Sequence, residues 1–157
     1  MASGGGGIAF CPTSNLFLGS GLFDLQRARS AGIPVGLGTD VGGGTSFSML
    51  QTANEAYKVL QLGRQTLSST DALYLATLGA AQTLGIDDKV GSFEAGKEAD
   101  FVVLDAKATA LIERRLAHSP NIEDTLFAHM ILGDDRSVAA TYIMGTRAYQ
   151  KTTQVTA

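Results

Sequence analysis

The stretch Val35-Gly-Leu-Gly-Thr-Asp-Val-Gly-Gly-Gly-Thr45 decides the fold of this chain. The apolar residues 33–37 predict a buried strand, and Asp40 follows where that strand ends. In β/α barrels, a carboxylate at the carboxyl end of a buried parallel strand is typical of a catalytic group. The alternative is that Asp40 only caps the next turn, because Asp is common in turns. The run of glycines that follows allows the backbone to approach a ligand closely or to adopt a positive φ.

A second short apolar segment, residues 8–11, lies upstream and predicts another buried strand. Between the two segments, apolar residues at helical spacing predict a helix over residues 21–31, which Gly32 ends. A strand, a helix and a strand in this order predict a right-handed β-α-β unit, in which the two strands are parallel. We therefore expect residues 8–11 and 33–37 to lie side by side.

A polar cluster, Thr13-Ser14-Asn15, follows the first of these strands. Because the carboxyl ends of parallel neighbours meet at one edge of a sheet, we expect Asn15 and Asp40 to lie at that shared edge. The alternative is an ordinary turn, in which these side chains bond to the local backbone.

Two helices are predicted after the glycine run. An apolar face that includes Phe47 predicts a helix over residues 46–63. Ser68 with Asp71 resembles a capping box and predicts one continuous helix that runs to Leu84. The pattern of helices that follow the two strands is typical of the closing part of an α/β layer.

The pattern changes beyond residue 86, where short apolar runs alternate with glycines. Strands are predicted at Phe101–Leu104, Val138–Ile143 and residues 147–150, and helices at residues 111–116 and 122–132. Met144-Gly145-Thr146 predicts a hairpin turn between the last two strands. We expect Phe101–Leu104 to pair with strands of this hairpin in a separate β-rich unit.

The composition excludes several classes of protein. The 157 residues are 45% hydrophobic and 17% charged, which is typical of a globular chain rather than a disordered one. The net charge of −3 without a basic block argues against nucleic acid or an anionic membrane surface as a partner. A single cysteine, Cys11, and no segment typical of a signal peptide or a membrane span favour a cytoplasmic location.

The residues alone predict little chemistry beyond Asp40. A catalytic zinc usually has three protein ligands, and Cys11, Asp40, His118 and His129 are the conceivable set, although neither histidine stands in a recognised metal-binding spacing. Core or surface positions are the simpler interpretation of both histidines. The glycine run lacks the Lys and Ser or Thr of a phosphate-binding loop, and its Gly-x-Gly is a weak sign of dinucleotide binding.

A resemblance to a known family extends over nearly the whole chain. It is carried by Ile8-Ala-Phe-Cys-Pro-Thr-Ser-Asn-Leu-Phe-Leu-Gly-Ser-Gly-Leu-Phe23, Gly36-Leu-Gly-Thr-Asp-Val-Gly-Gly-Gly-Thr45, Met49-Leu-Gln-Thr-Ala-Asn-Glu-Ala-Tyr-Lys58, Tyr74-Leu-Ala-Thr-Leu-Gly79, Gly91-Ser-Phe-Glu-Ala-Gly-Lys-Glu-Ala-Asp-Phe-Val-Val-Leu-Asp105, Gly133-Asp-Asp-Arg-Ser137 and Thr141-Tyr-Ile-Met-Gly145. Together these segments resemble the guanine deaminases of the metal-dependent amidohydrolase superfamily.

The resemblance implies an α/β fold: the C-terminal part of an amidohydrolase (β/α)₈ barrel, with its last two strands, plus part of a small β-sandwich domain. Residues 1–85 would be the barrel part and residues 86–157 the C-terminal portion of the sandwich. It also implies that Asp40 binds zinc and moves protons while water converts guanine to xanthine and ammonia in purine catabolism. Ser14 and Asn15 would lie near the substrate.

The family's histidine ligands, catalytic glutamate and guanine-reading side chains would all precede the stretch present here. We therefore expect zinc and guanine to bind only in a complete enzyme, and this chain to be inactive alone. It would assemble as a homo-oligomer or with the missing N-terminal portion. Another aminohydrolase of the same superfamily, or a non-catalytic module for binding or assembly, stays open as an alternative.

Overall fold

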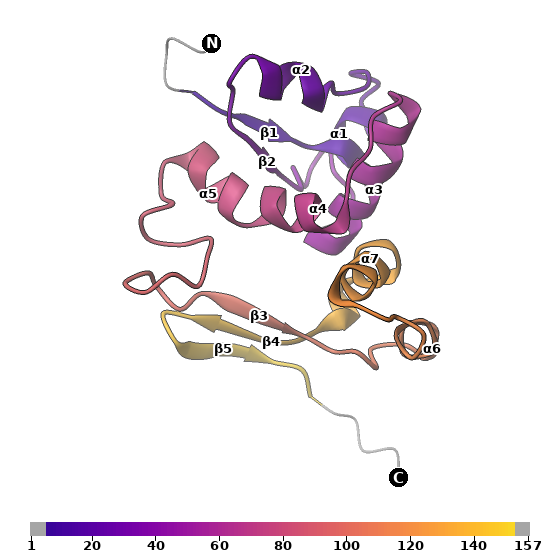
Figure 1. The fold of residues 1–157 in the computed structure, drawn as a ribbon, viewed down its shortest axis with the longest axis vertical. Coiled ribbons are helices and arrows are strands. Elements are labelled where there is room, and N and C mark those ends of the chain that lie inside the picture. Colours follow the sequence, from indigo (N-terminus) through magenta and orange to yellow (C-terminus); the bar gives the residue numbers. More distant parts are fainter. Residues whose placement is uncertain (1–5, 153–157) are drawn as a thin grey trace.

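The computed structural model describes residues 6–152, which form two parts that lie one above the other in Figure 1. The first part is a two-stranded sheet with helices on both sides. The second part is a three-stranded sheet with helices at one end. No helix in the described range is long and apolar enough to cross a membrane.

The strands β1 (Ile8–Phe10) and β2 (Val35–Leu37) pair in parallel, with Ile8 opposite Val35. This pairing confirms the predicted β-α-β unit, although each strand is shorter than predicted. Pro34 has no N–H group, and its carbonyl accepts a 2.9 Å hydrogen bond from the Ile8 N–H where the ladder starts. All three residues of β2 are buried, as expected for a strand with helices on both faces.

The connection between these strands contains two helices rather than one. α1 (Pro12–Phe17) begins directly after β1 with a proline in its first turn, where the missing N–H costs no helical hydrogen bond. α2 (Leu25–Ser30) is shorter than the predicted range 21–31 because the Asp24 side chain caps its first turn. Thr13-Ser14-Asn15 therefore lies in a helix and does not form the ordinary turn considered as an alternative.

The next helix, α3 (Met49–Leu62), starts later than the sequence pattern predicts. The Ser48 hydroxyl accepts a hydrogen bond from the Gln51 N–H and caps the helix. Phe47 precedes this cap and its side chain is 83% exposed, so the prediction that it belongs to the buried apolar face was wrong. Gly63 ends the helix as predicted.

The single helix predicted up to Leu84 is broken into α4 (Ser69–Ala76) and α5 (Leu78–Leu84). The break lies at Thr77, whose backbone leaves the helical region at φ −127° and ψ −98°. Its hydroxyl donates to the carbonyl four residues earlier at 2.6 Å, a bond that competes with the helical pattern. The predicted cap at Ser68 and the predicted stop at Gly85 are both confirmed.

The close approach of β2 and α5 requires a glycine. A Cβ atom added at Gly36 would lie 2.6 Å from the Cα atom of Ala80, which is backbone and cannot move aside without shifting the helix. This packing requires a glycine at the first position of the Gly-x-Gly pattern, so no bound nucleotide is needed to explain that residue.

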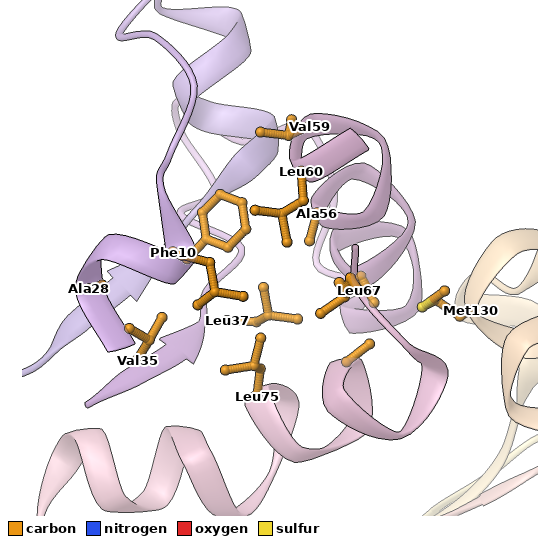
Figure 2. Packing of buried hydrophobic residues seen from close by; sticks show 13 residues of the cluster. Phe10, Ala28, Val35, Leu37, Ala56, Val59, Leu60, Leu67, Leu75 and Met130 are labelled. Atoms are coloured by element: carbon orange, nitrogen blue, oxygen red, sulfur yellow. The ribbon is translucent and has the colours of Figure 1, made fainter. Parts of the chain in front are cut away.

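A single hydrophobic core lies between the β1-β2 sheet and helices α3 and α4. Figure 2 shows Phe10 and Leu37 from the strands pointing toward Leu60 and Leu75 from the helices. The buried members of this core are Phe10, Leu25, Ala28, Val35, Leu37, Ala53, Ala56, Val59, Leu60, Leu67, Ala72, Leu75 and Met130.

The second sheet has the order β3-β4-β5 and is antiparallel throughout. Its strands are β3 (Phe101–Leu104), β4 (Val138–Ile143) and β5 (Thr146–Gln150), as predicted to within a residue. Met144 and Gly145 form the hairpin turn with φ values of 49° and 75°, the positive angles that a tight hairpin needs. The pairing of β3 with β4 confirms the predicted partner of that strand.

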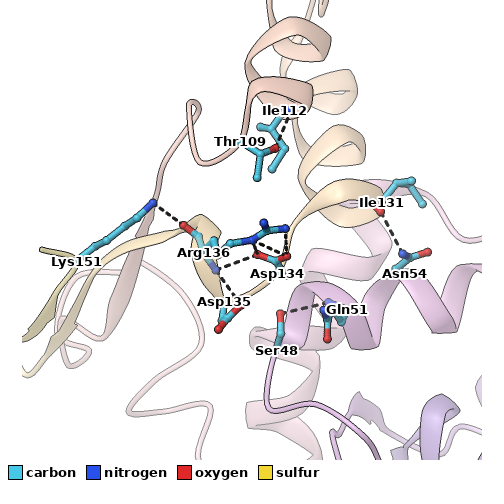
Figure 3. A network of polar contacts seen from close by, with 10 residues as sticks. All are labelled: Ser48, Gln51, Asn54, Thr109, Ile112, Ile131, Asp134, Asp135, Arg136 and Lys151. Atoms are coloured by element: carbon cyan, nitrogen blue, oxygen red, sulfur yellow. Dashed lines mark hydrogen bonds and ion pairs between the residues drawn. The ribbon is translucent and has the colours of Figure 1, made fainter. Parts of the chain in front are cut away.

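Helices α6 (Ala110–Leu116) and α7 (Ile122–Leu132) connect β3 to β4. α7 packs against α3 and α4, and its Met130 joins the core of the first part. The Asn54 side chain on α3 donates to the Ile131 carbonyl at 3.1 Å (Figure 3), and the Ser69 hydroxyl donates to the Glu123 carbonyl at 2.9 Å. The chain beyond residue 86 is therefore joined to the first part through α7.

Candidate active site

The carboxyl ends of β1 and β2 bring two segments together at one edge of the sheet. α1 follows β1 and carries Ser14, while Asp40 follows β2. The Ser14 hydroxyl donates a hydrogen bond of 2.6 Å to the Oδ2 atom of Asp40. The expected juxtaposition of the polar cluster and Asp40 is therefore present, and Ser14 is the member of the cluster that contacts the carboxylate.

A tight loop fixes the backbone at Asp40. Its φ of 47° lies in the left-handed region, which few residues other than glycine adopt. The carbonyl of Asp40 accepts hydrogen bonds from the N–H groups of Gly43 and Gly44. A Cβ atom added at Gly43 would lie 2.5 Å from the Ser14 hydroxyl oxygen, so the loop passes directly over that hydroxyl. The glycines were expected to let the backbone approach a ligand closely or adopt a positive φ; in the structure Gly42 has a φ of 131°, and the group that Gly43 approaches is the Ser14 side chain.

The other residues predicted for the site differ in exposure. Ser14 is buried at 2% exposure, Asn15 is half-buried on the same helix, and Asp40 is exposed. Thr13 lines a surface hollow of about 500 Å³ between α1, the end of the glycine loop and α3. The remaining lining residues of this hollow are Leu16, Phe17, Thr45, Ser46, Gln51, Asn54 and Glu55. Sequence reasoning missed this hollow, because α1 was not predicted as a helix.

The conceivable metal set of Cys11, Asp40, His118 and His129 does not assemble. Within residues 6–152 no group of three His, Cys, Asp or Glu side chains lies close enough to hold a metal ion. His118 is exposed at the end of α6, and His129 is buried on α7. Cys11 does lie near Asp40, but burial and the Asp40 charge raise the pKa of its thiol. A protonated thiol is a poor metal ligand.

The chain is similar in sequence and in fold to known proteins. A model of the amidohydrolase family matches residues 2–148. The chain belongs to the amidohydrolase family.

The sequence and the solved structure of E. coli guanine deaminase show the extent of the match within this family. Guanine deaminase of Escherichia coli K12 is 57% identical over 144 residues, which are 92% of this chain and 33% of the relative. The solved E. coli guanine deaminase superposes with a TM-score of 0.93 and 54% identity, over 96% of this chain and 36% of that one. This amidohydrolase chain therefore spans about a third of the length of the relatives it matches.

A more distant similar structure was solved with bound zinc. The adenosine deaminase of Xanthomonas campestris, which contains bound zinc, matches with a TM-score of 0.74 and 27% identity, over 90% of this chain and 32% of that one. The described part of the present chain offers Asp40 as one exposed carboxylate at the sheet edge, and a catalytic zinc needs about three protein ligands. Asp40 could therefore supply one ligand to a zinc ion, and the described residues do not supply the other ligands.

A second polar group lies buried apart from this edge. His129 is 6% exposed, and its Nδ1 atom has no hydrogen-bond partner among the described residues. It lines an apolar groove of about 800 Å³ between α3, α4, α7 and the β3-β4-β5 sheet. Burial lowers the pKa of the His129 imidazole, and the charge of Asp105 opposes that shift. Nothing in the sequence distinguished this histidine from His118, because burial depends on how α7 packs.

Proposed function

We propose that this chain is the C-terminal portion of a guanine deaminase, which hydrolyses guanine to xanthine and ammonia once the rest of the enzyme is present. Residues 1–85 would supply the last two barrel strands, and residues 86–157 would supply part of a small β-sandwich. The observation that carries this proposal is Asp40, held at the carboxyl edge of two parallel strands in a chain 57% identical to a guanine deaminase.

Asp40 would be one zinc ligand and the proton-transfer group of the site. Bound zinc supplies one piece of chemistry, because it lowers the pKa of a coordinated water. In this chain, Oδ2 of Asp40 already accepts the Ser14 hydrogen bond. Oδ1 makes no hydrogen bond among the described residues and would bind the metal, so the second lone pair of Oδ2 is where the carboxylate would receive a proton from the attacking water and return it to the leaving amino group. Zinc and guanine would both bind only in the complete enzyme, where other segments provide the remaining ligands.

Asn15 would contribute to the substrate pocket. It follows Ser14 on α1, is half-buried, and lies at the same edge as Asp40. An amide side chain offers both donors and an acceptor, which suits the edge of a purine ring. Ser14, also expected near the substrate, is buried against Asp40, so its contribution would pass through that residue.

A different aminohydrolase reaction is the second candidate. The likeness to an adenosine deaminase at a TM-score of 0.74 favours it, because that protein would share the same edge of the barrel. The two candidates agree on the role of Asp40 and differ in the purine that the remaining pocket selects.

A hybrid enzyme tests the proposal. The matched third of E. coli guanine deaminase is replaced by this chain, and ammonia release from guanine and from adenosine is measured with zinc content determined in parallel. We expect turnover of guanine with about one zinc per chain. A folded, zinc-loaded hybrid that turns over adenosine in place of guanine would show that residues of this chain also select the purine and would favour the second candidate, and one that turns over neither substrate would refute the proposed function.

A further inference from the structure

The Ser14 hydroxyl is placed to control the orientation of the Asp40 carboxylate. Its 2.6 Å hydrogen bond to Oδ2 joins the segments that follow two different strands, because Ser14 lies on α1 after β1 and Asp40 lies after β2. A hydroxyl that donates to an ionised carboxylate forms a stronger bond than one between neutral groups. The contact therefore acts directly on the side chain proposed as the metal ligand.

The surroundings of Ser14 leave its hydroxyl little freedom. The side chain is 2% exposed, so the donor side of the hydrogen bond is shielded from water, while the Asp40 acceptor is exposed. The loop lies directly over the hydroxyl, since a Cβ atom at Gly43 would come within 2.5 Å of its oxygen. Gly43 in turn donates its N–H to the carbonyl of Asp40 at 3.1 Å. Backbone and side chain of Asp40 are thus both tied to the same small cluster.

No other group in the described range shares this task. Cys11 lies close to Asp40, but its thiol donates to the Ala9 carbonyl at 3.6 Å instead. Among residues 6–152, Ser14 is the one donor to the Asp40 carboxylate, and the bond uses only Oδ2. With Oδ2 occupied, Oδ1 is the oxygen left for a ligand.

We propose that Ser14 is a positioning residue, which fixes the Asp40 carboxylate in one orientation and leaves Oδ1 free. Its effect on metal binding rests on the proposed function, in which Asp40 is a zinc ligand. Groups that hydrogen-bond a metal ligand typically change metal affinity or activity 10- to 100-fold when they are removed. Ser14 therefore acts on the reaction through Asp40 and not by contact with the substrate.

The orientation is measured first on the 157-residue chain itself. Three-bond NMR couplings from the Asp40 Cγ atom to its backbone nitrogen and carbonyl carbon report the χ1 angle. We expect values typical of one rotamer in the unaltered chain and averaged values in Ser14→Ala. Ser14→Cys is the second variant, because it keeps the volume with a much weaker donor and protects the test if the alanine variant does not fold. Couplings that stay at one-rotamer values in both folded variants would overturn the proposal.

A matched control comes from another buried serine. Ser137 is fully buried and its hydroxyl has no partner among the described residues, so Ser137→Ala removes an equally buried hydroxyl far from Asp40 in the sequence. We expect this variant to leave the Asp40 couplings unchanged. Averaged couplings in Ser137→Ala would show a general loosening of the fold and would count against a specific role of Ser14.

Metal retention is measured in the hybrid enzyme. We expect Ser14→Ala and Ser14→Cys to lose zinc to a chelator about 10- to 100-fold faster than the unaltered hybrid, with kcat falling and KM nearly constant. Ser137→Ala should match the unaltered hybrid. Unchanged rates of zinc release in both Ser14 variants would overturn the effect of Ser14 on the metal. A hybrid that binds no zinc would refute the proposed function instead. In that case the NMR couplings of Asp40 in the 157-residue chain decide whether Ser14 positions the carboxylate.

Discussion

Asp40 combines the position proposed for catalysis with an uncommon backbone conformation. Asp and Asn tolerate the left-handed region better than most residues, because their short polar side chains bond locally. A site that needs an acid at this place in the loop can therefore have one at small conformational cost. The same fact makes Asn the substitution of choice for separating the chemistry from the fold.

Asp40→Asn is expected to abolish most deamination by the hybrid enzyme while the fold is retained. The amide keeps the backbone angle and can still accept the Ser14 hydrogen bond, but it is a poorer metal ligand and cannot accept a proton. We expect kcat to fall about 10²- to 10⁴-fold, in line with the typical contribution of a proton-transfer group. Steady-state ammonia release measures it, and an unchanged unfolding midpoint is the control. A near-normal rate would refute the assignment of Asp40.

His129 is expected to make the stability of the chain depend on pH. Burial lowers the pKa of this imidazole in the folded state, so the unfolded chain binds more protons when the medium is acidic. The free energy of unfolding should therefore fall as the pH drops below the ordinary histidine value of 6.5, and should show no contribution from His129 well above it. Urea unfolding at a series of pH values on both sides of that point measures the effect.

The matched control for this titration is the exposed histidine. His129→Gln should flatten the dependence of the unfolding free energy on pH, while His118→Gln should leave its slope unchanged. Equal slopes in the unaltered chain and in His129→Gln would contradict the prediction.

At the scale of helices and strands, the sequence predicts best those elements whose limits are local. Ser68 and Gly85 mark helix ends through their own side chain or backbone, and the hairpin at Met144 is set by its turn. The break at Thr77 could not be predicted from periodicity, because the apolar spacing continues through it and the cause is a hydroxyl that bonds within its own helix. α1 was missed for a related reason, since its first residue is a proline that also reads as a strand stop.

The candidate site was predictable in place but not in detail. Two short strands with a polar residue after each are enough to predict that Asp40 and the cluster on α1 meet at one edge. The hydrogen bond from Ser14 depends on a side-chain rotamer and on the loop that passes over it at Gly43. The glycine run predicts a close approach of the backbone but not the side chain that it meets, and the rotamer has no signature in the sequence, so Ser14 and Asn15 were equally good candidates beforehand.

Gly36→Ala is expected to destabilise the packing of β2 on α5. The added methyl group would lie 2.6 Å from the Cα atom of Ala80, and the helix must shift to make room. Overpacking of this kind typically costs about 1–3 kcal/mol in the free energy of unfolding. Gly63→Ala is the matched control, because φ there is −81° and the nearest atom would lie at an ordinary 3.4 Å. Urea unfolding of both variants measures the difference, and equal stabilities would contradict this account of the contact.

As a whole molecule, this chain spans about a third of the length of the guanine deaminases it matches. We expect no ammonia release from guanine by the chain alone, even with zinc supplied. The described residues offer one carboxylate for the metal, and two parallel strands cannot enclose a pocket that excludes water. Turnover of guanine by the purified chain alone, at a rate above a zinc blank, would contradict this expectation.

The unpaired strand edges of both sheets are expected to promote self-association. Within the described range, β3 and β5 are the outer strands of their sheet and β1 and β2 each pair on one side only. Unpaired strand edges are ready to pair with another chain, and the exposed valines of β3 add apolar surface. Sedimentation velocity over a range of concentrations should show dimers or larger species that increase with concentration. A clean monomer at the highest concentration would contradict the prediction.

The return of α7 onto α3 and α4 also has a consequence for inheritance. Met130, encoded far downstream, is buried in a core whose other fully buried members come from residues 10–75, and Phe127 and Ile131 of α7 pack against the same core. A genetic crossover between α4 and α7 would join α7 from one ancestor to α3 and α4 from another. The Met130 side chain would then pack against core residues from a different sequence, to which its shape is not matched. We therefore expect the stretch from β1 to α7 to have passed between lineages as one block, with natural breakpoints placed outside it.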